Sequence, residues 1–327
     1  MRRVSSQPAE VRSGFKLLDL IVVCVVLFIL AAVFMPMLCD TRVVGRRAEC
    51  LNRMKNLGIA SHNWATTNRG NLPGYAAASS EGEPMRSWVV DLLPYIDRND
   101  LGDRWNYEEK WDSTMAGLDG SSNLSIASMG ISVLRCPSAA LDEESDAVLN
   151  YVVNSGFANR RNKRLHNYDQ LAVDWNSDGQ LDEKDHNIAR DSGVCWLTTD
   201  DSPGGLNFDD FEDGAGNTIL FGERLDSGQS TWAAPSVKNC AFTYPIDPNS
   251  QSIGTAKSDP LENATISVSN DQPHPPMLSS NHGDWVGIAT AEGAVRTLNV
   301  DIDPDLLRRL ITPRGSIHDE EVITEGY

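Results

Sequence analysis

The sequence predicts an α+β protein in which a long N-terminal helix packs on an antiparallel β-sheet head. Three observations support this fold class. Residues 20–38 carry no charged side chain, and residues 44–58 place apolar side chains every three or four positions. Short strand-like runs surround turn residues near the C-terminus. The chain of 327 residues is long enough to bury a sizeable core in the head.

The apolar run at 20–38 predicts a single membrane-spanning helix. Its 19 residues would form a helix of about 28 Å, close to the hydrocarbon thickness of a bilayer. A cleaved secretory signal would need a small-residue cleavage site after a shorter apolar region, but here the run continues past Ala31-Ala32. A lipoprotein signal would need small residues before a cysteine, whereas Cys24 and Cys39 follow bulky side chains.

A third interpretation fits the details of this segment, which resembles the type IV pilin and pseudopilin signature. Gly14 precedes Phe15, Asp19 stands at the fifth mature position where that signature has glutamate, and Pro36 follows at the twenty-second. The resemblance implies that a prepilin peptidase cuts after Gly14 and that the new Phe15 amine is methylated. It also implies that Asp19 pairs with the amine of a neighbouring pilin-like subunit, because an unpaired carboxylate is costly in a membrane helix.

This resemblance divides the chain into a leader (1–14), a spine helix (15–70) and an extracytoplasmic head (71–327). The spine has a transmembrane half and an amphipathic half, and one face of the amphipathic half is predicted to pack on the head. Basic residues flank both ends of the span, so the pilin pattern alone places the N-terminus inside. We therefore expect a single-pass protein of the inner (cytoplasmic) membrane with its head outside or at the cell surface. The packing face comprises Val44, Ala48, Leu51, Met54 and Gly58.

Ordered blocks along the chain resemble a large family with prepilin-type leaders that is abundant in planctomycetes and is classed as domain of unknown function 1559. His282 and Glu292-Gly293 match its C-terminal H-x9-DG signature, with Glu in place of Asp. The biochemical role of that family is undefined, so the resemblance implies an anchored α+β protein and no particular reaction. The other blocks read CLNRMKNLGIASHN (50–63), SWVVDLLPY (87–95), LRCPS (134–138) and DGAGNTILFGE (213–223).

The C-terminal signature is interpreted as structural. Strand-like runs at 286–291 and 294–298 predict a hairpin whose two-residue turn is Glu292-Gly293. Asp tolerates a left-handed turn conformation better than Glu, so the substitution bears on the quality of the turn. A catalytic His282 would need a nucleophile and an orienting acid, and no such arrangement is recognisable. We interpret it as a buried, hydrogen-bonded histidine, and the absence of catalytic motifs predicts that the protein is not an enzyme.

Charge is concentrated in one acidic segment of a chain that has 28 basic and 46 acidic residues, a net charge of −18. Residues 1–69 carry ten basic and four acidic side chains, whereas residues 174–226 carry three basic and fourteen acidic ones. An acidic chain lacks the cations that neutralise phosphates, so we expect no nucleic-acid partner.

The acidic segment contains a pattern that predicts a calcium loop within an insert at about 165–200. Oxygen donors stand at positions 1, 3, 5, 7, 9 and 12, with Gly179 at position 6 for the sharp turn. The loop resembles the dockerin type, because position 12 is Asp. The alternative is a surface turn that binds no metal. We expect a structural calcium rather than a switch, since the loop has no paired partner. The predicted ligands are Asp174, Asn176, Asp178, the Gln180 carbonyl, Asp182 and Asp185.

Four of the six cysteines lie in the predicted head, and no C-x-x-C pair is present. Four cysteines in an oxidising compartment allow three pairings. Because Cys50 and Cys136 both lie in blocks of the family resemblance, we propose that pair, which leaves Cys195 with Cys240. The leading functional hypothesis is a pilin-like envelope protein with a structural or assembly role. The alternative is a calcium-dependent binding or adhesion module held by a single-span anchor.

Overall fold

The computed structural model describes residues 17–117, 119–139, 147–159, 180, 182–224, 231–246, 278–318 and 321–324. Side chains are not described at 31–43, 158–159, 186 and 245–246. The predicted cleavage site, Gly14 and Phe15, and the predicted loop residues Asp174, Asn176 and Asp178 lie outside the described residues. The chain divides into two compact units, Met1–Arg46 and Arg47–Tyr327.

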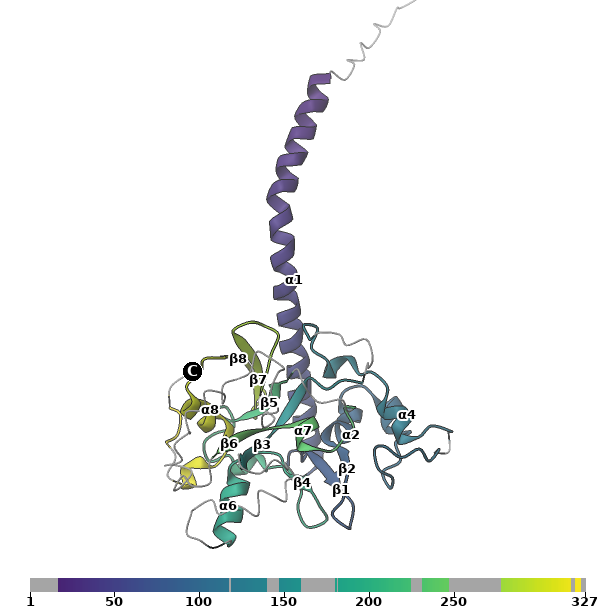
Figure 1. Cartoon of the computed structure of the whole chain (residues 1–327), viewed down its shortest axis with the longest axis vertical. Helices are drawn as coiled ribbons and strands as arrows, with labels where there is room; N and C mark the ends of the chain where they lie inside the picture. Colours follow the sequence, from purple (N-terminus) through teal and green to yellow (C-terminus); the bar gives the residue numbers. More distant parts are fainter. Residues whose placement is uncertain are drawn as a thin grey trace, which may run out of the picture. The chain divides into compact units, whose positions relative to one another are not determined.

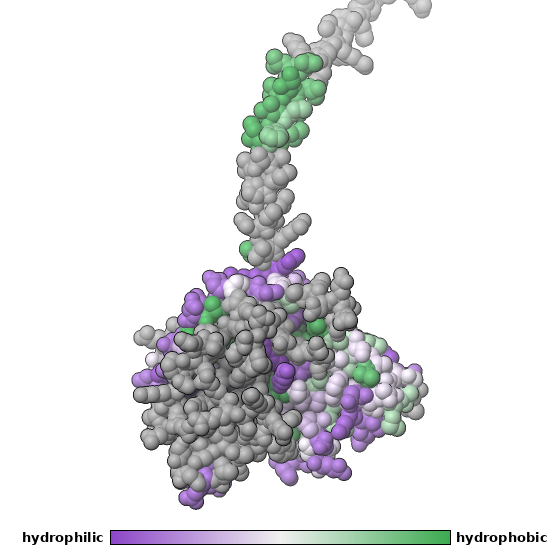
Figure 2. Space-filling model, viewed as in Figure 1, coloured by the Kyte–Doolittle hydropathy of each residue, from purple (hydrophilic) through white to green (hydrophobic). Residues whose placement is uncertain are grey.

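Helix α1 runs from Leu17 to Thr67 and contributes to both units. In the first unit, apolar side chains between Leu17 and Leu30 are exposed, and Figure 2 shows this stretch as a hydrophobic band. Within the described residues, no helix meets the length and apolarity required to cross a membrane. Much of the predicted span, residues 31–38, lies where side chains are not described.

In the second unit, the helix is part of the core. Its buried face begins at Cys50 and continues through Met54, Leu57 and Ala65, each at most 2% exposed. The predicted packing face is therefore only partly correct: Met54 and Gly58 are buried, but Val44 and Ala48 are exposed. Apolar spacing defines a stripe along a helix, but burial also needs an opposing surface, and here that surface begins at Cys50.

The main sheet has five strands in the order β6-β3-β5-β7-β8 (Figure 1). Neighbours along β3-β5-β7-β8 are antiparallel, but β6 is parallel to β3. The expectation of an antiparallel sheet is therefore wrong for this edge, because β3 and β6 are joined by a long excursion rather than by a hairpin. The strands are β3 (Tyr151–Asn159), β5 (Ile219–Glu223), β6 (Ala241–Ile246), β7 (Trp285–Thr290) and β8 (Val295–Asn299).

A smaller three-stranded sheet has the order β2-β1-β4. Strand β1 (Ala76–Ala78) is antiparallel to β2 (Pro84–Ser87) and parallel to β4 (Leu197–Thr198). This sheet is also mixed, since β4 comes from a segment more than 100 residues downstream of β1. The remaining helices are α2 (Trp88–Leu92), η1 (Leu93–Tyr95), α3 (Asn99–Gly102), α4 (Asn123–Ala127), η2 (Ser132–Leu134), α6 (Glu183–Asp191), η3 (Phe208–Asp210), α7 (Val237–Cys240), α8 (Pro304–Ile311) and η4 (Gly315–His318).

The five-stranded sheet separates two hydrophobic clusters. Side chains of a strand point alternately to its two faces. The first residues of β3 follow this rule: Tyr151 and Val153 join the cluster that contains α1, whereas Val152 joins the other. The second cluster also holds Leu307 and Leu310 of α8. Because β5 is buried along its whole length, a residue at its end lies deep in the head.

The hairpin between β7 and β8 differs from the predicted two-residue turn. The amide of Gly293 donates to the carbonyl of Thr290 at 2.9 Å, and the Thr290 amide donates to Ala294 at 2.8 Å. Three residues therefore connect the strands, and the left-handed conformation falls on Gly293, with φ of 89°. Glu292 does not adopt a positive φ. Glu in place of Asp therefore places no strain on this turn.

Candidate functional site

A disulfide joins Cys50 of α1 to Cys136, which follows η2, across 86 residues of sequence. Both cysteines are buried, with Cα atoms 5.2 Å apart. The Tyr151 hydroxyl donates to the carbonyl of Cys50 at 3.1 Å, and burial raises the pKa of this phenol. The Cys136 amide donates to Oδ1 of Asn150 at 2.9 Å. The bridge is therefore tied to the start of β3 on both sides.

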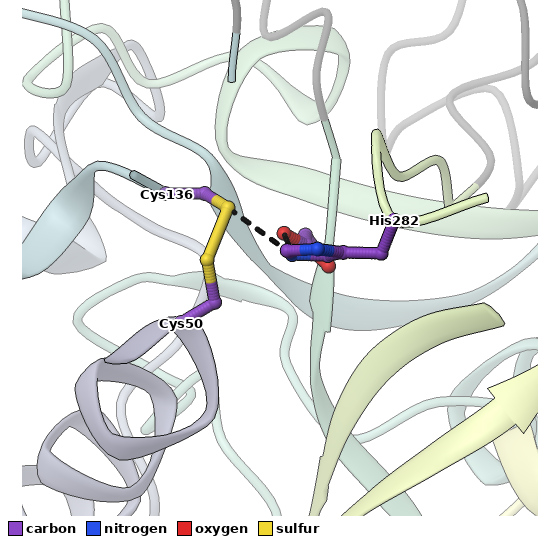
Figure 3. Close-up of side chains that lie close together, drawn as sticks. Cys50, Cys136 and His282 are labelled. Atoms are coloured by element: carbon purple, nitrogen blue, oxygen red, sulfur yellow. Dashed lines mark hydrogen bonds and ion pairs between the residues drawn. A yellow bond between two sulfur atoms is a disulfide. The ribbon is translucent and has the colours of Figure 1, made fainter. Parts of the chain in front are cut away.

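His282 approaches this disulfide from the loop before β7 (Figure 3). Its Nε2 lies 3.4 Å from Sγ of Cys136 and 3.2 Å from Oε1 of Glu223, the last residue of β5. The side chains of His282 and Glu223 are 3% and 1% exposed. An imidazole, a carboxylate and a disulfide thus meet at one buried point.

The two oxygens of Glu223 have different surroundings. Oε2 accepts hydrogen bonds from the Ser280 hydroxyl at 3.0 Å and from the Gly287 amide at 3.3 Å. Oε1 faces His282 but has no aligned hydrogen bond among the described residues. A buried carboxylate oxygen without a hydrogen bond is costly, so this oxygen is the least satisfied acceptor of the site.

The outer side of His282 is held by aromatic and polar contacts. Its ring stacks on that of Trp285, with centroids 4.2 Å apart, and the Arg47 guanidinium lies 4.1 Å from the same indole. The Ser280 hydroxyl accepts from the His282 amide at 3.1 Å. The Asn281 side chain donates to the Ser138 carbonyl at 3.1 Å and so links this loop to the segment after Cys136.

The arrangement does not have the geometry of a catalytic triad. In a triad, one ring nitrogen of the histidine contacts the nucleophile and the other contacts the acid. Here Cys136 and Glu223 both lie against Nε2. What the four groups share is the ability to bind a metal: one ligand atom from each of Cys50, Cys136, Glu223 and His282 lies within 4.8 Å of all the others.

The described half of the predicted calcium loop leads into helix α6. Gln180 is exposed, and Asp182 caps the helix by accepting from the Lys184 amide at 2.9 Å. Asp185 is buried and accepts from the Asp182 amide at 3.2 Å, which completes a capping box. Positions 9 and 12 of the predicted loop are therefore held in the first turn of a helix.

The predicted bridge between Cys195 and Cys240 is not present: of the described cysteines, these two and Cys24 carry free thiols. The Cys240 thiol donates to the carbonyls of Tyr75 at 3.3 Å and Ser236 at 3.1 Å, so it is satisfied without a bridge. Burial raises the pKa of Cys240 to about 12 and also raises that of Cys195. The predicted bridge rested on elimination, because Cys195 and Cys240 remained once Cys50 and Cys136 were paired. In the fold each of the two is instead a buried free thiol.

The remaining predicted residues lie apart from the cluster or at its edge. Asp19 lies in the first turn of α1. Glu292 and Gly293 form the hairpin tip, where the Cα of Gly293 lies 3.7 Å from a Cβ built on Gly58. Glu223 and Trp285 were not among the predicted site residues. The sequence does contain an indication that Glu223 is a site residue. It is an acidic residue that directly follows the apolar run TILFG (218–222), which forms a buried strand.

Comparison with known proteins supplies a family but no characterised relative. A family model described as "Protein of unknown function (DUF1559)" matches residues 40–305. No curated protein and no solved structure matches the chain. The matched region contains the disulfide, Glu223 and His282.

Proposed function

Because the chain belongs to the DUF1559 family of proteins of unknown function, we propose a role that rests on its own N-terminal helix. The protein is a membrane-anchored, pilin-like envelope protein, processed by a prepilin peptidase after Gly14. Its role is structural or in assembly, and its head lies outside the cytoplasm.

The course of α1 is the observation that carries this proposal. The helix continues without interruption from Leu17 to Thr67. Its first turns present exposed apolar side chains, whereas its last turns are buried in the head from Cys50 onward. An exposed apolar helix in water is unfavourable, so this part needs lipid or a neighbouring helix. The buried Cys50–Cys136 disulfide further supports an oxidising compartment.

The experiment compares cells that produce the C-terminally tagged wild-type chain, Asp19→Ala and Asp19→Glu. We expect wild-type and Asp19→Glu chains to lack residues 1–14, to carry a methylated Phe15 and to fractionate with membranes. If the chain polymerises, shearing releases wild type and Asp19→Glu as polymer but not Asp19→Ala. An intact leader together with a wholly soluble chain would contradict the anchor, and equal release of all three chains would contradict assembly through Asp19.

A calcium-dependent binding module is a second candidate, favoured by helix α6. The helix begins at Glu183, position 10 of the predicted loop, and Asp182 and Asp185 lie at its start. A calcium loop is followed by a helix in the helix–loop–helix calcium motif. Calorimetry of the full-length chain in detergent tests this candidate. We expect calcium binding by wild type and by Asp209→Ala, an acid outside the loop, and at least about tenfold weaker binding by Asp178→Ala. No heat of binding at millimolar calcium would contradict it.

A further inference from the structure

We propose that the Cys50–Cys136 disulfide is one of two states of the site, and that the reduced site binds a divalent zinc ion. The ligands are the two thiolates, Nε2 of His282 and Oε1 of Glu223. This inference is independent of the proposed anchor, because it rests on the head alone.

Two of the separations already present match those of a tetrahedral zinc site, and every pair of ligand atoms lies within 4.8 Å. Zinc binds thiolate sulfur at about 2.3 Å and imidazole nitrogen or carboxylate oxygen at about 2.0–2.2 Å. Tetrahedral angles then separate a sulfur and a nitrogen ligand by about 3.5 Å, and a nitrogen and an oxygen ligand by about 3.3 Å. The observed separations are 3.4 Å between Cys136 Sγ and His282 Nε2, and 3.2 Å between His282 Nε2 and Glu223 Oε1.

The two sulfurs are too close, because they are bonded to each other. In a tetrahedral zinc site they would be about 3.8 Å apart. A disulfide sulfur carries no thiolate charge and is a poor zinc ligand, so the bridge and the metal exclude each other. The Cα atoms of the two cysteines, 5.2 Å apart, do not prevent the sulfurs from separating by rotation of the side chains.

The ligands are oriented by further contacts, as metal ligands in proteins usually are. Ser280 and Gly287 hydrogen-bond to Oε2 of Glu223 and leave Oε1 free to face the other ligands. The stack on Trp285 holds the plane of the His282 ring. A buried acceptor that lacks a hydrogen bond, aimed at an imidazole and two sulfurs, is better satisfied by a metal ion than by the observed contacts.

The loop that carries His282 lies between the site and solvent. Its residues Asn281, Gly283 and Asp284 are exposed, so one side of the site lies beneath a surface loop, although Glu223 belongs to the central strand β5. A Cβ built on Gly283 meets nothing within 4 Å. A small displacement of this loop therefore admits solvent and an ion.

The change from the disulfide to the zinc-bound site takes two steps, which are reduction of the S–S bond and binding of the metal. A dithiol present in the same compartment as the head, or a phosphine in the test tube, breaks the S–S bond, and each sulfur ends as a thiol. The dithiol is oxidised to its own disulfide, whereas the phosphine is oxidised to its oxide with the oxygen of water. Zinc then replaces the two thiol protons, which leave to solvent, and the metal remains divalent throughout.

The test uses the full-length chain in detergent, oxidised or reduced with tris(2-carboxyethyl)phosphine and then desalted without air. Cobalt(II) is the probe, because cobalt–thiolate coordination gives a near-ultraviolet charge-transfer band that calcium-type oxygen sites do not give. We expect the band in the reduced chain alone, one zinc per chain to displace it, and two protons to be released per zinc. A reduced chain without the band overturns the proposal whether or not that chain is folded, because zinc binding would itself drive folding of the site.

Substitutions identify the ligands. His282→Ala and Glu223→Gln should each weaken cobalt binding at least about tenfold, the lower limit even for residues that only orient a ligand. Cys195→Ser and Cys240→Ser, which remove buried thiols outside the cluster, should leave the band unchanged. A band that survives His282→Ala but disappears in Cys240→Ser would overturn the assignment. The comparison of oxidised with reduced wild type needs no variant. It therefore tests whether the reduced site binds metal even where a substituted chain fails to fold.

Discussion

The imidazole of His282 lies flat against the indole of Trp285, with an angle of 10° between the ring planes. The guanidinium of Arg47, at the start of the helical part of the second unit, lies over the same indole. Trp285 is therefore the element through which α1 and β7 both hold the histidine. The stability of the head and the position of His282 should depend on this one ring.

Replacing Trp285 tests that relationship. We expect Trp285→Ala to lower the free energy of unfolding by about 3 kcal/mol, because a large buried ring and its stacked partners are lost. Trp285→Phe keeps a ring against His282 and should cost less than half as much. Urea unfolding of the full-length chain in detergent, followed by circular dichroism, measures both. Equal losses in the two variants would show that a ring at position 285 that is smaller than indole contributes nothing to the stability of the head.

Removing the disulfide should destabilise the head strongly. The bridge closes a loop of 86 residues, so the double variant Cys50→Ser/Cys136→Ser should lose about 4 kcal/mol of unfolding free energy. Cys24→Ser, which removes an exposed thiol, is the control and should have no effect. The measurement is urea unfolding followed by circular dichroism. A loss below about 1 kcal/mol would mean that the bridge constrains little of the unfolded chain.

The hairpin tip offers a matched pair of substitutions. Gly293→Ala places a side chain at a φ of 89° and should cost about 1–2 kcal/mol. Glu292→Asp, which restores the residue of the family signature, should change stability by less than about 0.5 kcal/mol because residue 292 does not adopt a positive φ. Thermal unfolding of wild type and the two variants measures these changes in stability. A large stabilisation by Glu292→Asp would instead place the strain of the turn at residue 292.

The buried thiol of Cys240 predicts a loss of stability at high pH. Burial raises its pKa from 9.0 to about 12. Between these values the unfolded chain has lost the proton and the folded chain keeps it, so the folded chain binds more protons. The free energy of unfolding therefore falls as pH rises, by up to about 1.4 kcal/mol per pH unit from this group.

Comparison with Cys240→Ala isolates this contribution from other groups that titrate in the same range. The stability difference between wild type and the variant should stay constant from pH 7 to about pH 8.5 and should then shrink toward pH 11. Alkylation gives an independent measure: iodoacetamide at pH 8.5 should label Cys195 and Cys240 only after unfolding. A constant difference up to pH 11, with rapid labelling of Cys240, would contradict the burial effect.

The helix was predictable from sequence because its signals are local. A long apolar run followed by apolar side chains at helical spacing predicts a helix near 15–70, and α1 occupies Leu17–Thr67. The strands on both sides of Glu292-Gly293 were also predictable from local signals, and they correspond to β7 and β8. Their turn was assigned to two residues rather than three, because turn length depends on which strand residues pair, and pairing is set by the whole sheet.

The site could be predicted only in part, for a physical reason. The residue types and their order identified Cys50, Cys136, Glu223 and His282 as members of family blocks. Nothing in the order of the blocks says that Glu223, at the end of β5, meets the other three at one buried point, because that depends on how strands from distant segments stack beside α1. The sequence by itself determined which ligand-type side chains exist and where the helix runs. The tertiary structure alone decided which cysteines lie within bonding distance, which thiols stay buried and free, and which carboxylate faces the histidine, since each is a contact between residues far apart in the chain.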